Sequence, residues 1–74
     1  MLIVLSSARR HRVNEDDMSH AIDNAVRIWD VDDERVIYVG PSRSGALLEV
    51  GAYQATDGVI VFHAMPCRTK YLPR

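Results

Sequence analysis

The chain has 74 residues, of which 47% are hydrophobic and 26% are charged, and its formal net charge is −1. This composition is typical of one small globular domain, residues 1–74, and excludes a disordered chain. The single cysteine, Cys67, excludes an internal disulfide and favours a reducing compartment. The apolar run over residues 1–5 is too short to span a membrane or to act as a signal peptide, so we expect a cytoplasmic protein without membrane contact.

Charge is distributed unevenly along the chain. The net charge is +3 over residues 1–13, −7 over residues 14–34 and +3 over residues 35–74. If the two basic ends meet in the fold, they form a patch that a phosphate backbone would bind. A solvated surface with internal charge balance is the alternative.

The N-terminal segment predicts a short strand over residues 2–5 and a short helix over residues 8–12. Ser6 and Ser7 are both candidate N-caps for that helix. Because the helix is so short, it must dock on the rest of the domain to be stable.

A second helix is predicted from Asn14, a residue that caps helix N-termini well. Three acidic residues follow it, where the helix dipole favours negative charge, so they indicate a helix start rather than a metal site. Apolar residues recur at helical spacing and form the expected buried stripe: Met18, Ala21, Ile22 and Ala25. Asn24 is expected to end the helix.

From Val26 onward the apolar residues alternate with a period of two, which predicts strands. Two β-rich runs within residues 36–50 flank a loop bounded by Gly40 and Gly45, so we expect a hairpin that pairs Val39 with Ala46. A turn over residues 54–58 then leads to a last strand over residues 59–64. The prediction is an α+β fold in which two N-terminal helices pack on a four-stranded antiparallel meander.

The register of the last strand stays open at this stage. A four-residue turn would pair Val50 with Val61 and place His63 on the face of Leu48. A five-residue turn would pair Val50 with Ile60 and place His63 on the face of Glu49. A slip of one residue exchanges the two faces of a strand, so His63 faces either the core or a site.

The chemistry-bearing residues point away from metals and cofactors. The sequence has no metal-ligand spacing, no glycine-rich phosphate loop and no Ser-His-Asp arrangement. His63 ends a strand and is followed by Arg68, Lys70 and Tyr71. A histidine can act as acid or base near neutral pH, and nearby cations can hold a phosphodiester. His11 lies in a basic run and is a second candidate base.

Three segments, in order, resemble BrnT-like toxins of the RelE-like superfamily of toxin–antitoxin ribonucleases. Residues 10–17 (RHRVNEDD) resemble that family's Lys-His-Gly-Val-Ser-x-Glu-Glu helix entry, with Arg12 in place of the glycine. Residues 37–50 (IYVGPSRSGALLEV) resemble its Ile-Gly-x-Ser-x-x-Gly-x-Leu-Leu-x-Val hairpin. Residues 61–68 (VFHAMPCR) fall where the family has its last strand and an Arg-rich stretch.

The resemblance implies a RelE-like fold and a metal-independent endoribonuclease that cleaves messenger RNA and is neutralised by a small antitoxin protein. No cofactor or metal is expected, and the sequence leaves open whether the protein is a monomer, a homo-oligomer or a hetero-oligomer. We assign the expected roles by position in this chain. The expected catalytic residues are His63, Arg68, Lys70 and His11, and the expected RNA-binding residues are Arg9, Arg10, Arg43 and Tyr71.

A second hypothesis assumes the same fold but no catalytic activity. In it, the domain is a non-catalytic interaction module that binds a partner protein along an edge of its sheet. RNA degradation by the purified protein separates the two hypotheses.

Overall fold

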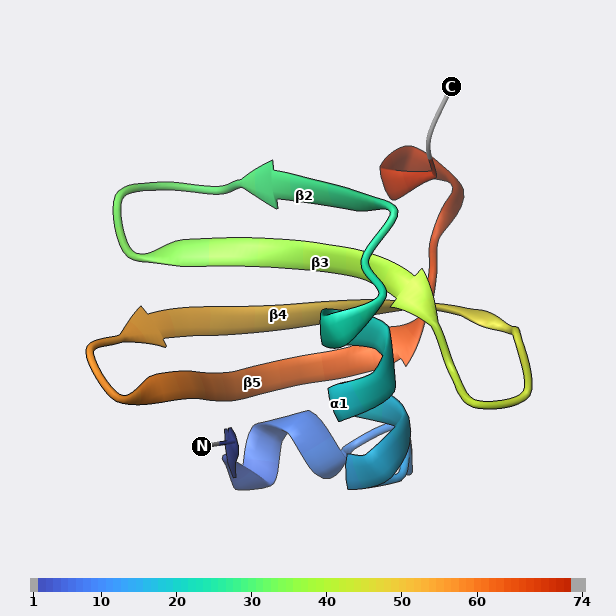
Figure 1. Cartoon of the computed structure of the whole chain (residues 1–74), viewed down its shortest axis with the longest axis horizontal. Coiled ribbons are helices and arrows are strands. Elements are labelled where there is room, and N and C mark those ends of the chain that lie inside the picture. Colours follow the sequence, from blue (N-terminus) through green and yellow to red (C-terminus); the bar gives the residue numbers. More distant parts are fainter. Residues whose placement is uncertain (1, 73–74) are drawn as a thin grey trace.

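The computed structural model describes residues 2–72, and every structural statement below concerns these residues. Five strands form one sheet in the order β1-β5-β4-β3-β2, and one α-helix packs on it (Figure 1). The strands are β1 (Leu2–Val4), β2 (Arg27–Asp30), β3 (Arg35–Pro41), β4 (Leu47–Ala55) and β5 (Gly58–Pro66). The helix is α1 (Glu15–Asp23), and two short 3₁₀ turns are η1 (Ser6–Arg9) and η2 (Thr69–Tyr71).

The predicted architecture of two helices on a four-stranded antiparallel meander is wrong. The strand expected at residues 2–5 forms, but it joins the sheet as a fifth strand and runs parallel to β5, with Leu2 opposite Val59 and Val4 opposite Val61. The other three strand pairs are antiparallel, so the sheet is mixed. This pairing covers the edge of β5 and lets Leu2 and Val4 pack against the core.

The helix predicted over residues 8–12 is also wrong, because only the single turn η1 forms there. Its N-cap position is Leu5, which offers no side-chain cap, and Ser7 Oγ instead donates to the carbonyl oxygen of Phe62 at 2.7 Å. A segment this short cannot offset the cost of helix nucleation. The chain leaves the turn through Arg12, whose φ of 59° is a left-handed conformation that favours glycine.

Helix α1 begins and ends where the sequence predicts. Asn14 Oδ1 accepts a hydrogen bond from the backbone N–H of Asp16 at 2.8 Å, and Asn24 is the C-cap. Met18 and Ala21 are fully buried, while Ile22 is half-buried and packs against the core. The capping residue and the apolar spacing were therefore sufficient to locate this element.

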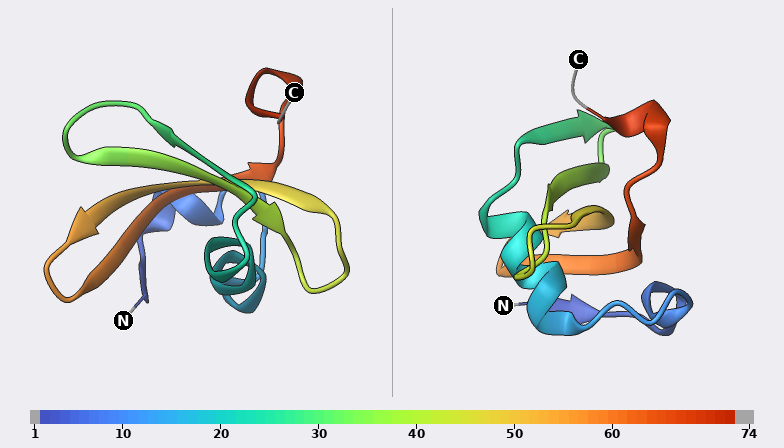
Figure 2. Two further views of the ribbon diagram at one scale, coloured as in Figure 1. Left: turned by 45° about the horizontal axis from the view of Figure 1, so that its top comes forward. Right: turned by 90° about the vertical axis from the view of Figure 1, so that its right-hand side faces the viewer.

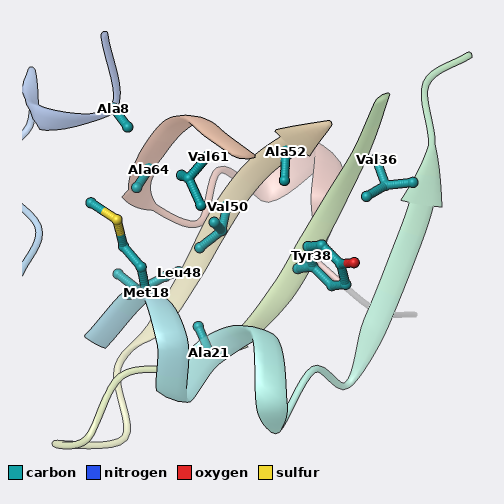
Figure 3. Packing of buried hydrophobic residues seen from close by; sticks show 10 residues of the cluster. All are labelled: Ala8, Met18, Ala21, Val36, Tyr38, Leu48, Val50, Ala52, Val61 and Ala64. Atoms are coloured by element: carbon teal, nitrogen blue, oxygen red, sulfur yellow. The ribbon is translucent and has the colours of Figure 1, made fainter. Parts of the chain in front are cut away.

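The core lies between α1 and one face of the sheet. The helix packs mainly on β3 and β4, and the buried side chains of the sheet point toward it (Figure 3). The cluster consists of Ala8, Met18, Ala21, Val36, Tyr38, Leu48, Val50, Ala52, Val61 and Ala64.

The hairpin of β3 and β4 has a different register from the predicted one. Val39 pairs with Glu49 rather than with Ala46, because β3 continues through Gly40 and Pro41. Gly40 is therefore not a turn residue. A Cβ at Gly40 would overlap the carbonyl oxygen of Ala21, so its missing side chain allows α1 to approach the sheet closely.

The last hairpin has a two-residue turn, so both registers considered for it are wrong. Ala55 pairs with Gly58, and Val50 pairs with Ala64. An irregularity at Gly51 and Ala52 shifts the register along β5. Because a bulge of this kind re-aims the side chains that follow it, Val61 and Ala64 both face the core while His63 lies on the face of Glu49.

The two faces of the sheet are covered differently. In the right-hand view of Figure 2, α1 lies on one side of the sheet and the C-terminal segment around η2 projects on the other. Within residues 2–72, no helix has the length and apolar character needed to cross a membrane.

Candidate functional site

A groove of about 840 Å³ lies on the face of the sheet opposite α1. It runs between the segment around η1 and the segment around η2. Its lining residues are Leu5, Ser7, Arg10, His11, Val31, Arg35, Ile37, Tyr53, Phe62, His63, Met65, Arg68 and Tyr71. This lining contains three arginines and two histidines but no carboxylate, so the groove favours an anionic ligand.

A buried carboxylate lies beneath the groove. The side chain of Glu49 is 0% exposed and is bonded by two groove residues. Arg68 donates from its backbone N–H (2.8 Å), from Nε (3.0 Å) and from Nη2 (2.7 Å), and His63 Nε2 lies 2.9 Å from Oε2. Burial alone would raise the pKa of Glu49, but the hydrogen bonds from Arg68 and His63 outweigh it and lower the pKa to about 2.

The ionised state of Glu49 fixes the tautomer of His63. A carboxylate without a proton only accepts hydrogen bonds, so the proton of the contact must be on Nε2 of His63. When the imidazole is neutral, Nδ1 is then the acceptor. The ring of His63 is therefore oriented by Glu49, and its Nδ1 can accept a proton.

A second imidazole lies beside the first. The ring of His11 meets the ring of His63 edge to face, with 6.2 Å between centroids. His11 comes from the segment after η1 and His63 from β5, so the fold brings together two residues separated by 52 positions. Two adjacent imidazoles can act as a general acid and a general base, and the nearby arginines can bind an anion.

The C-terminal segment around η2 contacts β2 through a hydrogen bond to its backbone and through packing of the Trp29 and Tyr71 rings. Trp29 Nε1 donates to the carbonyl oxygen of Tyr71 at 3.0 Å, and the two rings lie 6.4 Å apart. The guanidinium of Arg27 lies 4.3 Å from the Trp29 ring centroid. With the bond from Arg68 to Glu49, these contacts make the segment a fixed wall of the groove.

The structure brings five of the eight predicted site residues to the groove. They are His63, His11, Arg68, Arg10 and Tyr71. Lys70 is adjacent but does not line it, with Nζ 5.0 Å from the Tyr71 ring centroid.

The other two predicted residues lie elsewhere and form ion pairs with the acidic start of α1. Arg9 Nη2 lies 2.9 Å from Glu15 Oε2. Arg43 Nε lies 2.9 Å from Asp17 Oδ1, and its Nη1 lies 3.6 Å from Asp16 Oδ2. These contacts place Arg43 beside the acidic start of α1 and outside the groove lining.

Sequence reasoning missed Glu49, Tyr53 and Phe62 as site residues. Glu49 is an acid inside an apolar run, which is a signal for a paired buried charge. The signal was masked because the predicted register placed Val39 opposite Ala46 instead of opposite Glu49. Tyr53 and Phe62 pack ring to ring at 4.9 Å on the groove floor, and Phe62 reaches it through the bulge.

Among residues 2–72 there is no group of three or more His, Cys, Asp or Glu side chains that could hold a metal ion. Comparisons of the chain with protein-family models, with curated proteins and with solved structures gave no match.

Proposed function

We propose that the protein is a metal-independent endoribonuclease that cleaves single-stranded RNA in this groove. The observation that carries the proposal is the convergence of His11, His63, Arg10 and Arg68 on one carboxylate-free lining. These groups can together bind a phosphodiester and move the two protons that its transesterification requires.

The reaction needs only the RNA and the side chains of the groove. One imidazole accepts the proton of the ribose 2′-hydroxyl while the 2′-oxygen attacks phosphorus. The bond from phosphorus to the 5′-oxygen breaks, and the second imidazole donates a proton to that oxygen. The products are a 2′,3′-cyclic phosphate and a 5′-hydroxyl. We assign the base to Nδ1 of His63, because Glu49 holds the proton on Nε2, and the acid to His11.

The arginines have unequal roles in the proposal. Arg68 is bonded to Glu49, so much of its charge is already compensated and it mainly positions the groove wall. Arg10 takes part in no ion pair found within residues 2–72, so its full charge is available to a phosphate. Tyr71 lines the groove, and its ring is our candidate for base stacking, as in other single-strand sites.

The family resemblance extends the proposal to a toxin of a type II toxin–antitoxin system, neutralised by a small antitoxin. The left-handed backbone at Arg12, where the resembled family has glycine, supports the resemblance. Coexpression tests this part. Growth should stop when the chain is expressed alone and resume when the product of an adjoining short open reading frame is supplied.

The catalytic proposal is tested with the purified chain, EDTA and a labelled single-stranded RNA. His63→Ala and His11→Ala should each lower the cleavage rate by about a hundredfold or more. Arg9→Ala and Arg43→Ala are matched controls that remove an arginine outside the groove, and they should retain activity. An RNA with a 2′-deoxy residue at the cleaved position should not be cleaved, because it lacks the attacking 2′-oxygen.

Two results would contradict the proposal. Cleavage of the 2′-deoxy substrate would exclude attack by the 2′-oxygen. An inert wild-type chain would leave the non-catalytic interaction module as the better hypothesis, and activity that survives both histidine changes would exclude the roles assigned to His63 and His11.

A further inference from the structure

We propose that the free edge of β2 is a docking site for an extended, basic segment of another protein, which adds to the sheet as a sixth strand. β2 is the last strand of the sheet on this side, and β3 is its neighbour on the other (Figure 1). The site is separate from the groove chemistry and does not depend on the proposed ribonuclease function.

The backbone of β2 has hydrogen-bonding groups directed outward. The N–H of Val31 donates to the carbonyl oxygen of Arg35 in the direction of β3. In an antiparallel pair, residues alternate between bonding the partner strand and pointing away from it. Ile28 and Asp30 therefore present their N–H and C=O groups to the free edge, which is the template that an added strand requires.

The side chains at this edge are apolar and uncovered. Val26, which precedes β2, is 59% exposed, and Ile28, within β2, is 53% exposed. Helix α1 packs mainly on β3 and β4 and leaves this margin open. Ile28 is opposite Tyr38, which is buried, so the exposed residues continue the core outward. An added strand would extend that core by covering them.

The negative charge near β2 favours a basic binding partner. Residues 26–34 have a net charge of −3, and Asp30 and Asp33 take part in no ion pair found within residues 2–72. A second copy of this chain would bring the same negative charge to the interface. A segment with lysine or arginine beside Asp30 and apolar residues beside Val26 and Ile28 complements the edge in both respects.

The probe is a short synthetic peptide in which threonine alternates with lysine in one half and with isoleucine in the other. Titration followed by backbone amide NMR should shift the resonances of β2, chiefly Ile28 and Asp30. The same peptide with glutamate for lysine should bind at least about tenfold more weakly, because it places acids beside Asp30.

Variants of the two edges of the sheet provide the controls. Ile28→Ser and Asp30→Lys should each weaken binding of the lysine peptide about tenfold. Ile3→Ser is the matched control, because Ile3 is 48% exposed on β1 at the opposite edge, and it should leave the affinity unchanged.

Three outcomes would overturn the inference: no binding of the lysine peptide, shifts confined to β1 or to the groove, or equal affinity for the glutamate peptide. Sedimentation provides the remaining test. If the wild-type chain forms a dimer that Ile28→Ser dissociates, the edge is occupied by a second copy and the basic-segment proposal fails.

Discussion

Glu49 places a carboxylate in the middle of a strand whose neighbouring residues, Leu48 and Val50, belong to the core. An unpaired charge at such a depth would be very costly, and the surrounding donors offset that cost. The backbone N–H and guanidinium of Arg68 and the ring of His63 satisfy both carboxylate oxygens. One buried residue thus orients a proposed base and fixes the C-terminal wall of the groove.

Stability should depend on pH through this carboxylate. The pKa of Glu49 is lowered from 4.5 to about 2 in the folded chain, so its contribution is fully present above pH 4.5 and is lost as the pH falls toward 2. Urea unfolding of the wild-type chain across this range should therefore show falling stability. Glu49→Gln removes the titrating group, so the free energy of unfolding of this variant should depend less on pH over the same range.

The control for this prediction is a second carboxylate that titrates in the same range. The side-chain bond from Arg35 lowers the pKa of Asp32 to about 2, but Asp32 is at the surface, where solvent screens the interaction. Asp32→Asn should change the acid limb of the curve less than Glu49→Gln does. A larger effect from Asp32→Asn would show that the buried network is not the main acid-sensitive element.

At the scale of elements, the contact between α1 and β3 depends on the absence of a side chain at Gly40. Gly40→Ala should lower the free energy of unfolding by at least about 3 kcal/mol, because the new methyl group would overlap the backbone of Ala21. Urea unfolding measures the loss.

Gly51→Ala provides the comparison on the other face of the sheet. There the new methyl group would lie 2.9 Å from Cζ of Phe62, a side chain that can move. A cost of about 1 kcal/mol is expected. Equal losses for the two variants would mean that α1 does not rest directly on the strand.

Helix α1 was predictable because its signals are local. Asn14, the acids after it and the spacing of Met18 and Ala21 all lie within one short segment. The pairing of β1 with β5 was not predictable from pattern, because Leu2 and Val59 are far apart in the chain and a short apolar strand does not specify its neighbour. The hairpin registers were set by tertiary contacts, namely the fit of Gly40 under α1 and the bulge in β5.

In the candidate site too, residue types could be identified from the sequence, whereas their tertiary contacts could not. His63, Arg68 and His11 were found from residue type and order. Arg9 and Arg43 pair with acids at the start of α1 instead of lining the groove, and nothing in the local sequence indicates these ion pairs. Glu49 is marked in the sequence as an acid inside an apolar run, but its bonds to Arg68 and His63 depend on strand registers that the local sequence does not specify.

At the scale of the whole molecule, the two basic ends of the chain contribute to one groove, although Arg10 rather than Arg9 does so. RNA affinity should therefore fall as salt rises, with a slope of about 0.7 per phosphate contacted for a single strand. Arg10→Ala should reduce that slope by about 0.7. Arg43→Ala should leave it unchanged, because Asp17 and Asp16 already neutralise Arg43. Fluorescence anisotropy with a labelled RNA measures the salt dependence of binding for the wild type and for both variants. If the slope for Arg10→Ala equals that of the wild type, the RNA binds outside the groove.

The hydrogen bond from Trp29 to Tyr71 gives the molecule a built-in optical reporter. Trp29 is the only tryptophan in the sequence, and its indole N–H contacts the backbone of η2. Its emission therefore depends on whether this wall of the groove is in place, and no added label is needed. A ligand that displaces the segment exposes the indole to water and shifts its emission to longer wavelength, whereas a ligand that binds with the segment in place leaves the emission maximum where it was.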